Sequence, residues 1–388
     1  MLADTPCIND LMELLAIPAG PAEEAPVAEH LRRKLLSLGV PAACIESDDA
    51  HKKSEYGGNT GNLIVRLDGH GRGERRMFST HMDTVPDCIG AKPRIEGNFV
   101  VNDAPGKALG GDNRTGCAVV LQIARELLAR QGAHAPATLV FFVQEEVGLV
   151  GARWLDLEKL GRPKPALCFN WDSGTPHEII SAVTGTERLH IDVTGKACHA
   201  GRPEEGVSAA LVAAHALSTL ARHGWHGPIE KPQGIGSANC GILRGGQGSN
   251  VVMPSLYTLA EARSFDRAFR QTILSKWREA FEQAAAEVKI ASGETARVAF
   301  RPGPYYEAFE LPDTAPVVKA ALAACAKLGV AAKTVRNTGG MDANWIVAHG
   351  IPAVTLGCGM LNVHTPAERI NLDWFTTGCK LGVELAVG

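Results

Sequence analysis

The stretch ATLVFFVQEEVGLVGA, residues 137–152, decides the class of fold. Residues 137–143 form a short apolar run rich in β-branched and aromatic side chains, which predicts a central strand of a sheet. Two adjacent carboxylates, Glu145 and Glu146, follow it, and such neighbours repel each other unless cations compensate their charge. The stretch therefore predicts a buried strand that ends at a charged site.

Similar segments lie on both sides of this strand. They are three strand-like runs and one glycine-rich turn that leads into a helix, at residues 61–67, 75–81, 166–172 and 111–130 in that order. Strands that alternate with helices predict an α/β fold with a mostly parallel sheet. His81, Glu145, Glu146 and Asp172 then stand at the carboxyl ends of strands, which is the edge of an open α/β sheet where active sites form.

The pattern changes near Thr184 and returns to the earlier style after about Arg301. Between these points we expect four strands and two helices, a combination typical of a compact α+β insert. In chain order, the expected strands and helices of the insert lie at residues 187–195, 207–224, 237–246, 256–265, 267–289 and 295–303. The sequence therefore predicts a discontinuous domain of residues 1–183 and 302–388, interrupted by a second domain of residues 184–301.

Composition narrows the class of protein. A chain of 388 residues is too long for one ordinary core, and its net charge of -3 argues against a nucleic-acid partner. The N-terminal segment has no basic region before an apolar run, and no stretch is long and apolar enough for a membrane span. The 10 cysteines show no CxxC pair, which favours reduced thiols. We expect a cytoplasmic protein.

Five scattered side chains could bind metal. They are two imidazoles and three carboxylates: His81, Asp112, Glu146, Asp172 and His364. A mixed nitrogen and oxygen ligand set suits borderline divalent ions, zinc first, with cobalt or manganese as substitutes. The charge count favours a pair of ions, because three carboxylates offset most of the charge of two divalent cations. Glu145, beside one of the ligands, keeps its carboxylate free for acid–base work.

Each candidate also has an ordinary structural interpretation. His81 could be a histidine at a strand end, Asp112 a helix cap, Asp172 a turn aspartate and His364 a loop histidine. The glutamate pair could stand at a helix start, where the dipole favours negative charge. Each ordinary role is plausible for one residue alone. The metal interpretation is preferred because the ordinary roles would have to apply to all of these residues together.

At these residues the chain resembles the M20 family of co-catalytic metallopeptidases, nearly from end to end. The resemblance is carried by STHMDTVP (79–86), GGDNRTG (110–116), EEVGLVGA (145–152), WDSG (171–174), HTPAE (364–368) and, in the lid domain, GKACHAGRPEEGVSAA (195–210). It implies a zinc-peptidase catalytic domain of three α/β/α layers, with an inserted α+β domain that serves as lid and dimerisation domain. A homodimer through the lid domain is one expectation that follows.

The resemblance also implies a role for each residue. His81 and Asp172 would hold one ion, Glu146 and His364 the other, Asp112 would bridge them, Glu145 would be the general acid/base, and Asp83 would orient His81. Asp83 stands two residues after His81, so that its side chain can point to the same side of an extended backbone. Asn113 departs from the family pattern, in which a second Asp is common, and the family implies a cis peptide bond between Asp112 and Asn113.

Three residues of the insert would act on the substrate. The family implies that His199 polarises the scissile carbonyl or holds the oxyanion, while Asn250 and Arg263 contact the substrate. Arg263 would pair with a terminal carboxylate, which suits its planar guanidinium. Without the resemblance, a turn histidine and an inter-strand ion pair would be the preferred interpretations of His199 and Arg263.

The substrate expectation rests on the peptidase T-like branch. Asp172, where deacylases and carboxypeptidases of the family more often carry Glu, and the segments THMDTVP (80–86), GGQGSNVV (245–252) and LAEARS (259–264) resemble that branch. We therefore expect a tripeptide aminopeptidase that acts on short unblocked peptides. The alternatives are an N-acyl amino acid amidohydrolase or carboxypeptidase of the same family, and a non-catalytic scaffold on the same fold.

Overall fold

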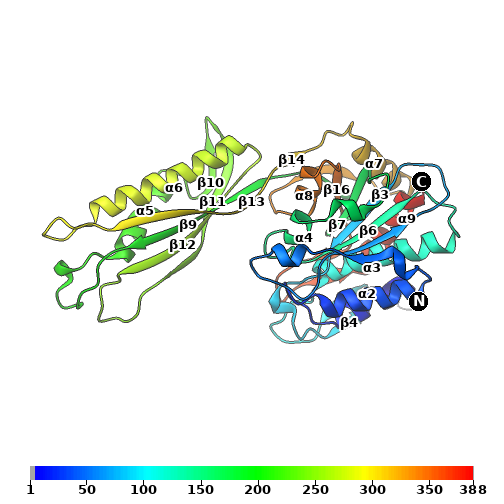
Figure 1. Cartoon of the computed structure of the whole chain (residues 1–388), viewed down its shortest axis with the longest axis horizontal. Helices are drawn as coiled ribbons and strands as arrows, with labels where there is room; N and C mark the ends of the chain where they lie inside the picture. The colour runs from blue at the N-terminus through cyan, green and yellow to red at the C-terminus, as the bar shows by residue number, and fades with distance from the viewer. Residues whose placement is uncertain (1–4, 388) are drawn as a thin grey trace. The chain divides into compact units, whose positions relative to one another are not determined.

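A computed structural model describes residues 5–387 of the chain (Figure 1). This part divides into two compact units. The first unit runs up to Ala182 and resumes with Glu310–Asn337 and from Met341 onward, and the second comprises Val183–Phe309 and Thr338–Gly340. The insert therefore begins one residue before the predicted Thr184.

The other predicted boundary, between Arg301 and Pro302, falls inside a strand. β13 (Arg297–Tyr306) continues through it and pairs along its length with β9 (Gly185–Thr194), with a register shift between Pro302 and Tyr305. Pro302 and Gly303 read as the end of a strand in the sequence, but the irregularity lets the strand continue past them. The second unit consequently ends at Phe309, and the short segment Thr338–Gly340 also belongs to it.

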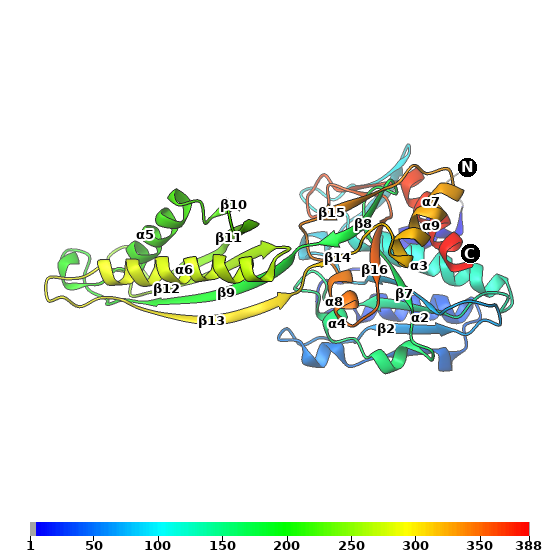
Figure 2. The ribbon, with the colours of Figure 1, turned by 90° about the horizontal axis from the view of Figure 1, so that it is seen from above.

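A nine-stranded sheet forms the centre of the first unit within the described residues (Figures 1 and 2). Its main path is β1 (Ile45–Ser47), β2 (Leu63–Leu67), β6 (Ala137–Phe142), β3 (Arg76–His81), β7 (Leu167–Ser173), β16 (Ala353–Gly357), β8 (Glu178–Val183) and β14 (Phe309–Glu310), with β15 (Lys333–Asn337) paired to β8. The four strands from β6 to β16 are parallel, whereas β1, β2 and β8 join them antiparallel. Every residue of β6 is buried, as its sequence predicts.

Helices cover the sheet and complete an α/β/α arrangement. Their bounds are α1 (Pro6–Leu15), α2 (Ala25–Ser37), α3 (Gly111–Ala129), α4 (Val150–Arg153), α7 (Pro316–Lys327), α8 (Ala343–Ala348) and α9 (Leu372–Val387). The longest of these, α3, packs against β3, α1 and α9, with Phe78, Phe169 and Trp171 of the sheet in the same buried cluster. Burial of such large side chains is the main stabilising contribution to this layer.

A small second sheet of the first unit has no counterpart in the sequence-based expectations. It pairs β17 (Met360–Leu361), β18 (Arg369–Asn371), β5 (Phe99–Asn102) and β4 (Pro93–Glu96) in that order. The loop between β17 and β18 carries His364. This sheet therefore joins the segment after β3 to the C-terminal part of the chain and fixes both ends of the His364 loop.

The second unit is an α+β domain. Its five-stranded antiparallel sheet has the order β10 (Gly227–Lys231), β11 (Gly234–Gly245), β12 (Ser255–Ser264), β9 and β13. α5 (Ala209–Arg222) and α6 (Arg267–Glu287) pack on it around a core of their own that includes Trp277 and Phe281. The predicted insert contained these two helices and four of these strands, and lacked only the short β10.

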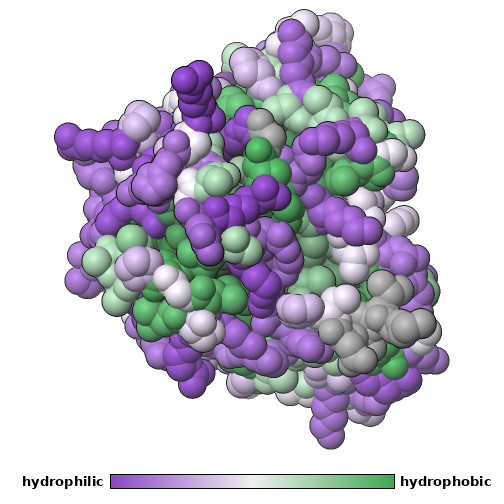
Figure 3. Space-filling model, turned by 90° about the vertical axis from the view of Figure 1, so that its right-hand side faces the viewer, coloured by the Kyte–Doolittle hydropathy of each residue, from purple (hydrophilic) through white to green (hydrophobic). Residues whose placement is uncertain are grey.

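The helices within residues 5–387 are all too short or too polar to cross a membrane. Figure 3 shows one face of the first unit. Hydrophobic and hydrophilic side chains alternate over this face.

Candidate metal centre

The parallel strands bring their carboxyl ends to one edge of the sheet. His81 is the last residue of β3, Asp172 lies near the end of β7, and Glu145 and Glu146 follow β6 after a short turn. Because β3 lies between β6 and β7, these side chains come from neighbouring strands. The edge is therefore occupied by one imidazole and three carboxylates, as the strand pattern predicts.

Asp112 joins this edge from the start of α3. The first turn of α3 is kinked, with non-helical backbone at Asp112 and Asn113, and the peptide bond between these two residues is cis, which confirms the prediction. Gly110 before the turn has a φ of 85°, a conformation that glycine adopts without strain. The kink directs the Asp112 carboxylate toward the histidines and away from its helix.

The two oxygens of the Asp112 carboxylate face different histidines. Oδ1 lies 3.1 Å from Nε2 of His81, and Oδ2 lies 3.1 Å from Nε2 of His364. Nε2 of His81 is also 3.5 Å from Oδ1 of Asp172, and Nε2 of His364 is 3.0 Å from Oε1 of Glu146. Two three-residue groups therefore share Asp112.

The donor atoms fit a pair of divalent ions. Three groups among the described residues have ligand atoms within 4.8 Å of one another: His81–Asp112–Asp172, Asp112–Glu146–His364 and His81–Glu145–Glu146. The first two contain all five predicted ligands, and each offers one imidazole nitrogen with two carboxylate oxygens. Nitrogen and oxygen donors of this kind suit zinc, cobalt or manganese.

The carboxylates of the site raise the pKa values of both histidines. Burial opposes the charged form of His81, but hydrogen bonds to Asp112, Asp172 and Asp83 outweigh it and raise its pKa well above the usual value. Hydrogen bonds to Asp112 and Glu146 raise the pKa of His364 to about 10. Both imidazoles are therefore cationic at neutral pH, and their charge stands where metal ions would neutralise the carboxylates.

The pKa values of the site's carboxylates shift in opposite directions. Burial opposes ionisation of Asp112, yet hydrogen bonds from His364 and His81 hold its pKa far below the usual value. Burial raises the pKa of Asp172 to about 6 and that of Glu146 to about 7, while it raises the pKa of Glu145 well above its usual range. Asp112 is thus the carboxylate that the site keeps ionised most strongly.

Asp83 fixes the turn that carries the two glutamates. Its carboxylate accepts the backbone N–H of Glu145 at 3.0 Å and of Glu146 at 3.1 Å, and its side chain is fully buried. Nδ1 of His81 lies 3.1 Å from the backbone oxygen of Asp83 and 3.3 Å from its Oδ1. Asp83 is therefore within reach of His81 as expected, but the nearer partner is its carbonyl.

Glu24 also holds the turn that carries the two glutamates, and the sequence did not predict this role. Its Oε1 accepts the backbone N–H of Gln144 at 2.9 Å and that of Ala22 at 3.0 Å. Gln144, immediately before Glu145, has a positive φ of 55°, so this contact holds an unusual backbone conformation in place. The residues are separated by more than a hundred positions, and no local pattern links them.

Glu368 supports the other turn of the site. Its carboxylate is buried and accepts the backbone N–H groups of Leu109, Gly110 and Asp112 at 2.7, 2.8 and 3.0 Å. It stands four residues after His364 in the HTPAE segment, so the segment supplies both a candidate ligand and the support of the bridging residue. The motif was visible in the sequence, but its glutamate had no role assigned.

The hydrogen bonds of Asn113 explain why an amide stands where the family often has a second aspartate. Its Nδ2 donates to the carbonyl of Trp171 at 2.6 Å and to Oδ1 of Asp172 at 3.3 Å, while its Oδ1 accepts the N–H of Gly116 at 3.0 Å. An ionised aspartate could not donate either of the first two bonds. The amide therefore links the bridging turn to β7 without adding a further negative charge.

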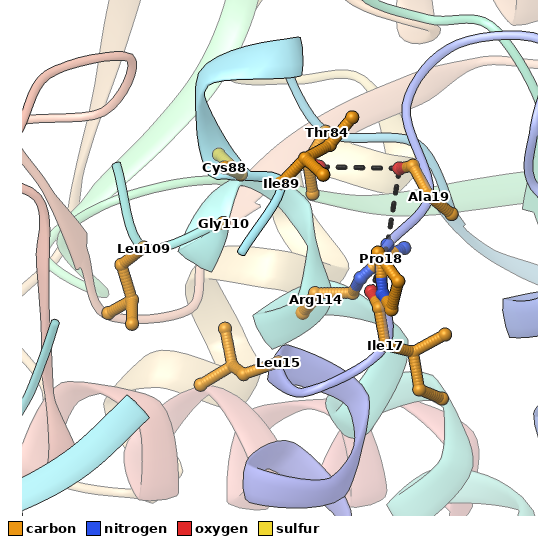
Figure 4. A pocket seen from close by; sticks show the side chains of 10 residues that line it. All are labelled: Leu15, Ile17, Pro18, Ala19, Thr84, Cys88, Ile89, Leu109, Gly110 and Arg114. Atoms are coloured by element: carbon orange, nitrogen blue, oxygen red, sulfur yellow. Dashed lines mark hydrogen bonds between the residues drawn. The ribbon is translucent and has the colours of Figure 1, made fainter. Parts of the chain in front are cut away.

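Arg114, the next residue, anchors the turn to the N-terminal segment. Its guanidinium donates to the carbonyls of Ile17 and Ala19 at 3.2 and 3.3 Å, and Thr84 donates to Ala19 as well (Figure 4). The pocket beside these residues has a volume of about 10 Å³. That space is about the size of one water molecule and cannot hold a peptide.

Asp342 is a further buried carboxylate near the centre. It is fully buried, and neither of its side-chain oxygens has a hydrogen-bond partner among the described residues. Burial, with the negative charges of Asp172, Asp83 and Glu146, raises its pKa well above the usual value, although His81 opposes this. The environment of Asp342 therefore favours its protonated form.

The three residues predicted to act on the substrate, His199, Asn250 and Arg263, all belong to the second unit, whereas the candidate metal ligands belong to the first. His199 and Asn250 lie side by side there, since the N–H of Ala200 donates to the carbonyl of Asn250 at 2.9 Å. Both side chains are exposed. Their roles toward a substrate stay predictions.

Arg263 is engaged with neighbours of its own unit. Its Nε donates to Oε1 of Glu261 at 2.6 Å and its Nη1 to the carbonyl of Thr338 at 2.6 Å. Glu261 also pairs with Arg188 on β9. Arg263 therefore forms an ion pair within β12, whereas the sequence had offered an inter-strand pair, and a substrate carboxylate would compete with Glu261.

Residues 77–387 match the model of peptidase family M20/M25/M40. The chain belongs to this family. Family membership confirms the resemblance drawn from the motifs and the expected fold, in which an α/β domain is interrupted by an α+β insert.

Two solved structures resemble almost the whole chain. A tripeptidase from Staphylococcus aureus is 28% identical with a TM-score of 0.85, and the match covers 98% of this chain and 96% of that one. The aminopeptidase PepT from Bacillus cereus is 32% identical with a TM-score of 0.80, over 98% and 97% of the two chains. This likeness supports the peptidase T-like branch.

A carboxypeptidase is also among the relatives. Carboxypeptidase G2 from a Pseudomonas species is 27% identical over 80% of this chain and 73% of its own length. The M20 family thus includes relatives whose names differ in which end of a peptide they act on.

Proposed function

We propose that this protein is an aminopeptidase that uses two divalent metal ions, most simply Zn²⁺, to release the N-terminal residue of short peptides such as tripeptides. One observation carries the proposal: the oxygens of Asp112 lie 3.1 Å from Nε2 of His81 and 3.1 Å from Nε2 of His364, with the carboxylate of Glu145 beside the first group. This geometry suits a carboxylate that two ions share. The proposed ions would occupy the His81–Asp112–Asp172 and Asp112–Glu146–His364 groups.

Bound at these groups, divalent ions would lower the pKa of a water molecule and polarise the scissile carbonyl. Among the protein's own groups, Glu145 has the properties of a general acid/base. It is not needed to complete either group around Asp112, and burial raises its pKa toward the range in which it can both take and return a proton. Glu145 would remove the proton of the attacking water and deliver it to the nitrogen of the leaving amine.

Asp83 and Glu24 would keep Glu145 in position during this transfer. Asp83 holds the backbone N–H of Glu145 and Glu24 holds that of the preceding Gln144. The carboxylate of Glu145 thus extends from a backbone that is fixed on both sides. Preorganisation of this kind avoids the cost of ordering the base for each reaction.

The second unit would supply the groups that recognise the substrate. His199 would stabilise the oxyanion of the tetrahedral intermediate, and Asn250 and Arg263 would contact the peptide, with Arg263 leaving Glu261 to meet a terminal carboxylate. These assignments rest on the family resemblance and on the exposure of His199 and Asn250. Partners other than a short peptide and a second copy of the chain are not expected.

Asp172 and the neighbouring structures favour an aminopeptidase over the alternatives. PepT from B. cereus is 32% identical to this chain and the tripeptidase from S. aureus 28%, whereas carboxypeptidase G2 is 27% identical. The carboxypeptidase or N-acyl amino acid amidohydrolase activity remains the second candidate, since that relative is 27% identical.

The deciding experiment identifies the products from Leu-Gly-Gly with zinc present. Free leucine and Gly-Gly are expected, and acetylation of the N-terminus should abolish turnover, because an aminopeptidase requires a free amine. Release of C-terminal glycine with Leu-Gly would instead show a carboxypeptidase. Turnover confined to N-acetylated amino acids would show an amidohydrolase, and either result would refute the aminopeptidase proposal.

A further inference from the structure

Arg263 lies beside two other charged side chains on one face of the five-stranded sheet. Glu261 and Arg263 stand two residues apart on β12, so their side chains point to the same side of the strand. Arg188 of β9 lies directly opposite Glu261 in the register of the two strands. The alternate residues of β12, Ala260 and Ala262, are buried in the core that α5 and α6 form with the sheet. The three charged side chains therefore share the face opposite to these helices.

Glu261 divides its carboxylate between the two arginines. Its Oε1 accepts Nε of Arg263 at 2.6 Å, and its Oε2 accepts Nε of Arg188 at 3.1 Å. The exposed fraction of these side chains is 24% for Glu261, 25% for Arg188 and 27% for Arg263, so a ligand can reach them from the solvent. Two guanidinium groups with one carboxylate leave one surplus positive charge, which attracts an anion such as a second carboxylate.

Each acceptor that Arg263 contacts also has a second donor. Glu261 has Arg188, and the carbonyl of Thr338 accepts Oγ1 of Thr184 at 3.0 Å as well as Nη1 of Arg263 at 2.6 Å. Departure of Arg263 would therefore leave neither acceptor without a partner. Because an acceptor that loses its only partner carries the main cost of a broken hydrogen bond, Arg263 can exchange its contacts at a low cost.

Glu261 offers Arg263 the same chemical group as the C-terminus of a peptide. Burial opposes ionisation of Glu261, but the hydrogen bond from Arg263 and the charges of Arg263 and Arg188 outweigh it and lower the pKa of this carboxyl. Glu261 is therefore ionised at neutral pH. A peptide carboxylate and Glu261 are then rivals for one guanidinium.

We propose that Glu261 sets the affinity for peptides, because it competes with their C-terminal carboxylate for the guanidinium of Arg263. The competition presupposes the proposed function, in which Arg263 meets that carboxylate. When a peptide binds, its carboxylate replaces Glu261 on Arg263, and Arg188 retains Glu261. An aminopeptidase leaves the C-terminal carboxylate on the remaining peptide, so the return of Glu261 to Arg263 also speeds the release of this product.

The effect of removing Glu261 has a definite sign. A ligand with a carboxylate must break the pair between Glu261 and Arg263, whereas a ligand with a C-terminal amide gains nothing from Arg263 and leaves the pair intact. Glu261→Gln removes the charge of the competitor and should strengthen the binding of carboxylate ligands alone. A purely structural role, in which Glu261 only orients Arg263, predicts weaker binding instead.

Titration calorimetry of the zinc-loaded full-length protein with Gly-Gly, the product expected from Leu-Gly-Gly, measures this effect without turnover. Glu261→Gln should bind Gly-Gly about fivefold more tightly than the natural protein, which is the upper range for a partly exposed ion pair. The KM for Leu-Gly-Gly should fall by the same factor, and the KM for Leu-Gly-Gly-amide should stay unchanged.

Two further variants complete the test. Asp192→Asn is the matched control, because Asp192 pairs with Arg301 at 3.1 Å on the same face of the sheet, and it should bind Gly-Gly as the natural protein does. Arg188→Gln removes the second partner of Glu261, so Glu261 should hold Arg263 more firmly and Gly-Gly should bind more weakly. The two arms of the prediction therefore have opposite signs.

The proposal is overturned if Glu261→Gln binds Gly-Gly no more tightly than the natural protein, if the amide gains as much as the free peptide, or if neither protein binds Gly-Gly. Failure of the proposed function gives a different result. A natural protein that does not release leucine from Leu-Gly-Gly refutes the aminopeptidase activity, while the calorimetric comparison of the variants still decides the role of Glu261.

Discussion

Glu368 accepts the backbone N–H of Asp112 at 3.0 Å and so holds the turn that presents the bridging carboxylate. The same glutamate accepts the N–H groups of Leu109 and Gly110. A buried carboxylate that collects three backbone donors fixes the backbone without touching a metal. Supports of this kind contribute to metal affinity although they are not ligands.

Glu368→Gln should weaken metal binding while the protein stays folded. The amide would present N–H groups to backbone donors, so at least one of the three hydrogen bonds is lost. We expect the affinity for zinc to fall about ten- to a hundredfold. A competition titration with a chromophoric chelator measures this, with Asp373→Asn, an exposed carboxylate, as the control. Unchanged affinity would show that the turn does not depend on Glu368.

Glu145→Gln should keep both metal ions and lose most turnover. The amide cannot take and return a proton, so kcat should fall by about a hundred- to ten-thousandfold with metal content unchanged. Glu146→Gln is the matched comparison, because it alters a proposed ligand and should lose metal as well as activity. A Glu145→Gln enzyme with a near-natural rate would assign the proton transfer to another group.

Metal uptake should release protons and become tighter as the pH rises. In the metal-free chain the pKa of His364 is raised to about 10 and that of Glu146 to about 7, so both groups hold protons at pH 6 that an ion must displace. Titration calorimetry in buffers of different ionisation enthalpy counts these protons. Uptake that is independent of pH between 6 and 8 would contradict the arrangement of His364 described above.

Glu24→Gln should change how the stability of the metal-free protein depends on pH. Burial and the charge of Asp83 raise the pKa of Glu24 from 4.5 to about 7, so the folded state holds a proton that the unfolded state loses, and stability falls as the pH rises through this window. The loss is about 3 kcal/mol at most. Glutamine carries no charge and should remove this slope.

Thermal unfolding of the chelator-treated protein at pH 5 and pH 8 tests this prediction. Glu23→Gln, at the adjacent exposed glutamate, is the control and should follow the natural protein. A Glu24→Gln variant whose melting temperature falls between the two pH values as steeply as that of the natural protein would show that Glu24 is ionised in both states.

The sequence predicted the candidate metal ligands and Glu145, but it did not predict the buried glutamates that hold the backbone around them. His81, Glu145, Glu146 and Asp172 follow apolar strands, and the parallel order of those strands is enough to bring them together. Glu24 and Glu368 contact the site from distant positions and depend on the packing of whole segments. Periodicity and motif spacing describe neighbours along the chain, so they do not reveal such contacts.

The second boundary of the insert also depends on a contact between distant segments, which local sequence patterns do not reveal. Pro302 and Gly303 resemble the end of a strand, and the sequence analysis placed the boundary there. The partner strand β9 continues to offer hydrogen bonds on the far side, so β13 pairs again from Tyr305. Pairing with a strand more than a hundred residues away thus outweighed the local signal.

In the proposed function, five residues hold two divalent ions that share Asp112. Zinc titration of the chelator-treated protein, followed by elemental analysis after gel filtration, tests it most directly. We predict about two ions per chain in the natural protein, with Asp112→Ala losing most of both because each group would lack its shared ligand. No more than one ion in the natural protein, or two ions retained by Asp112→Ala, would contradict the account.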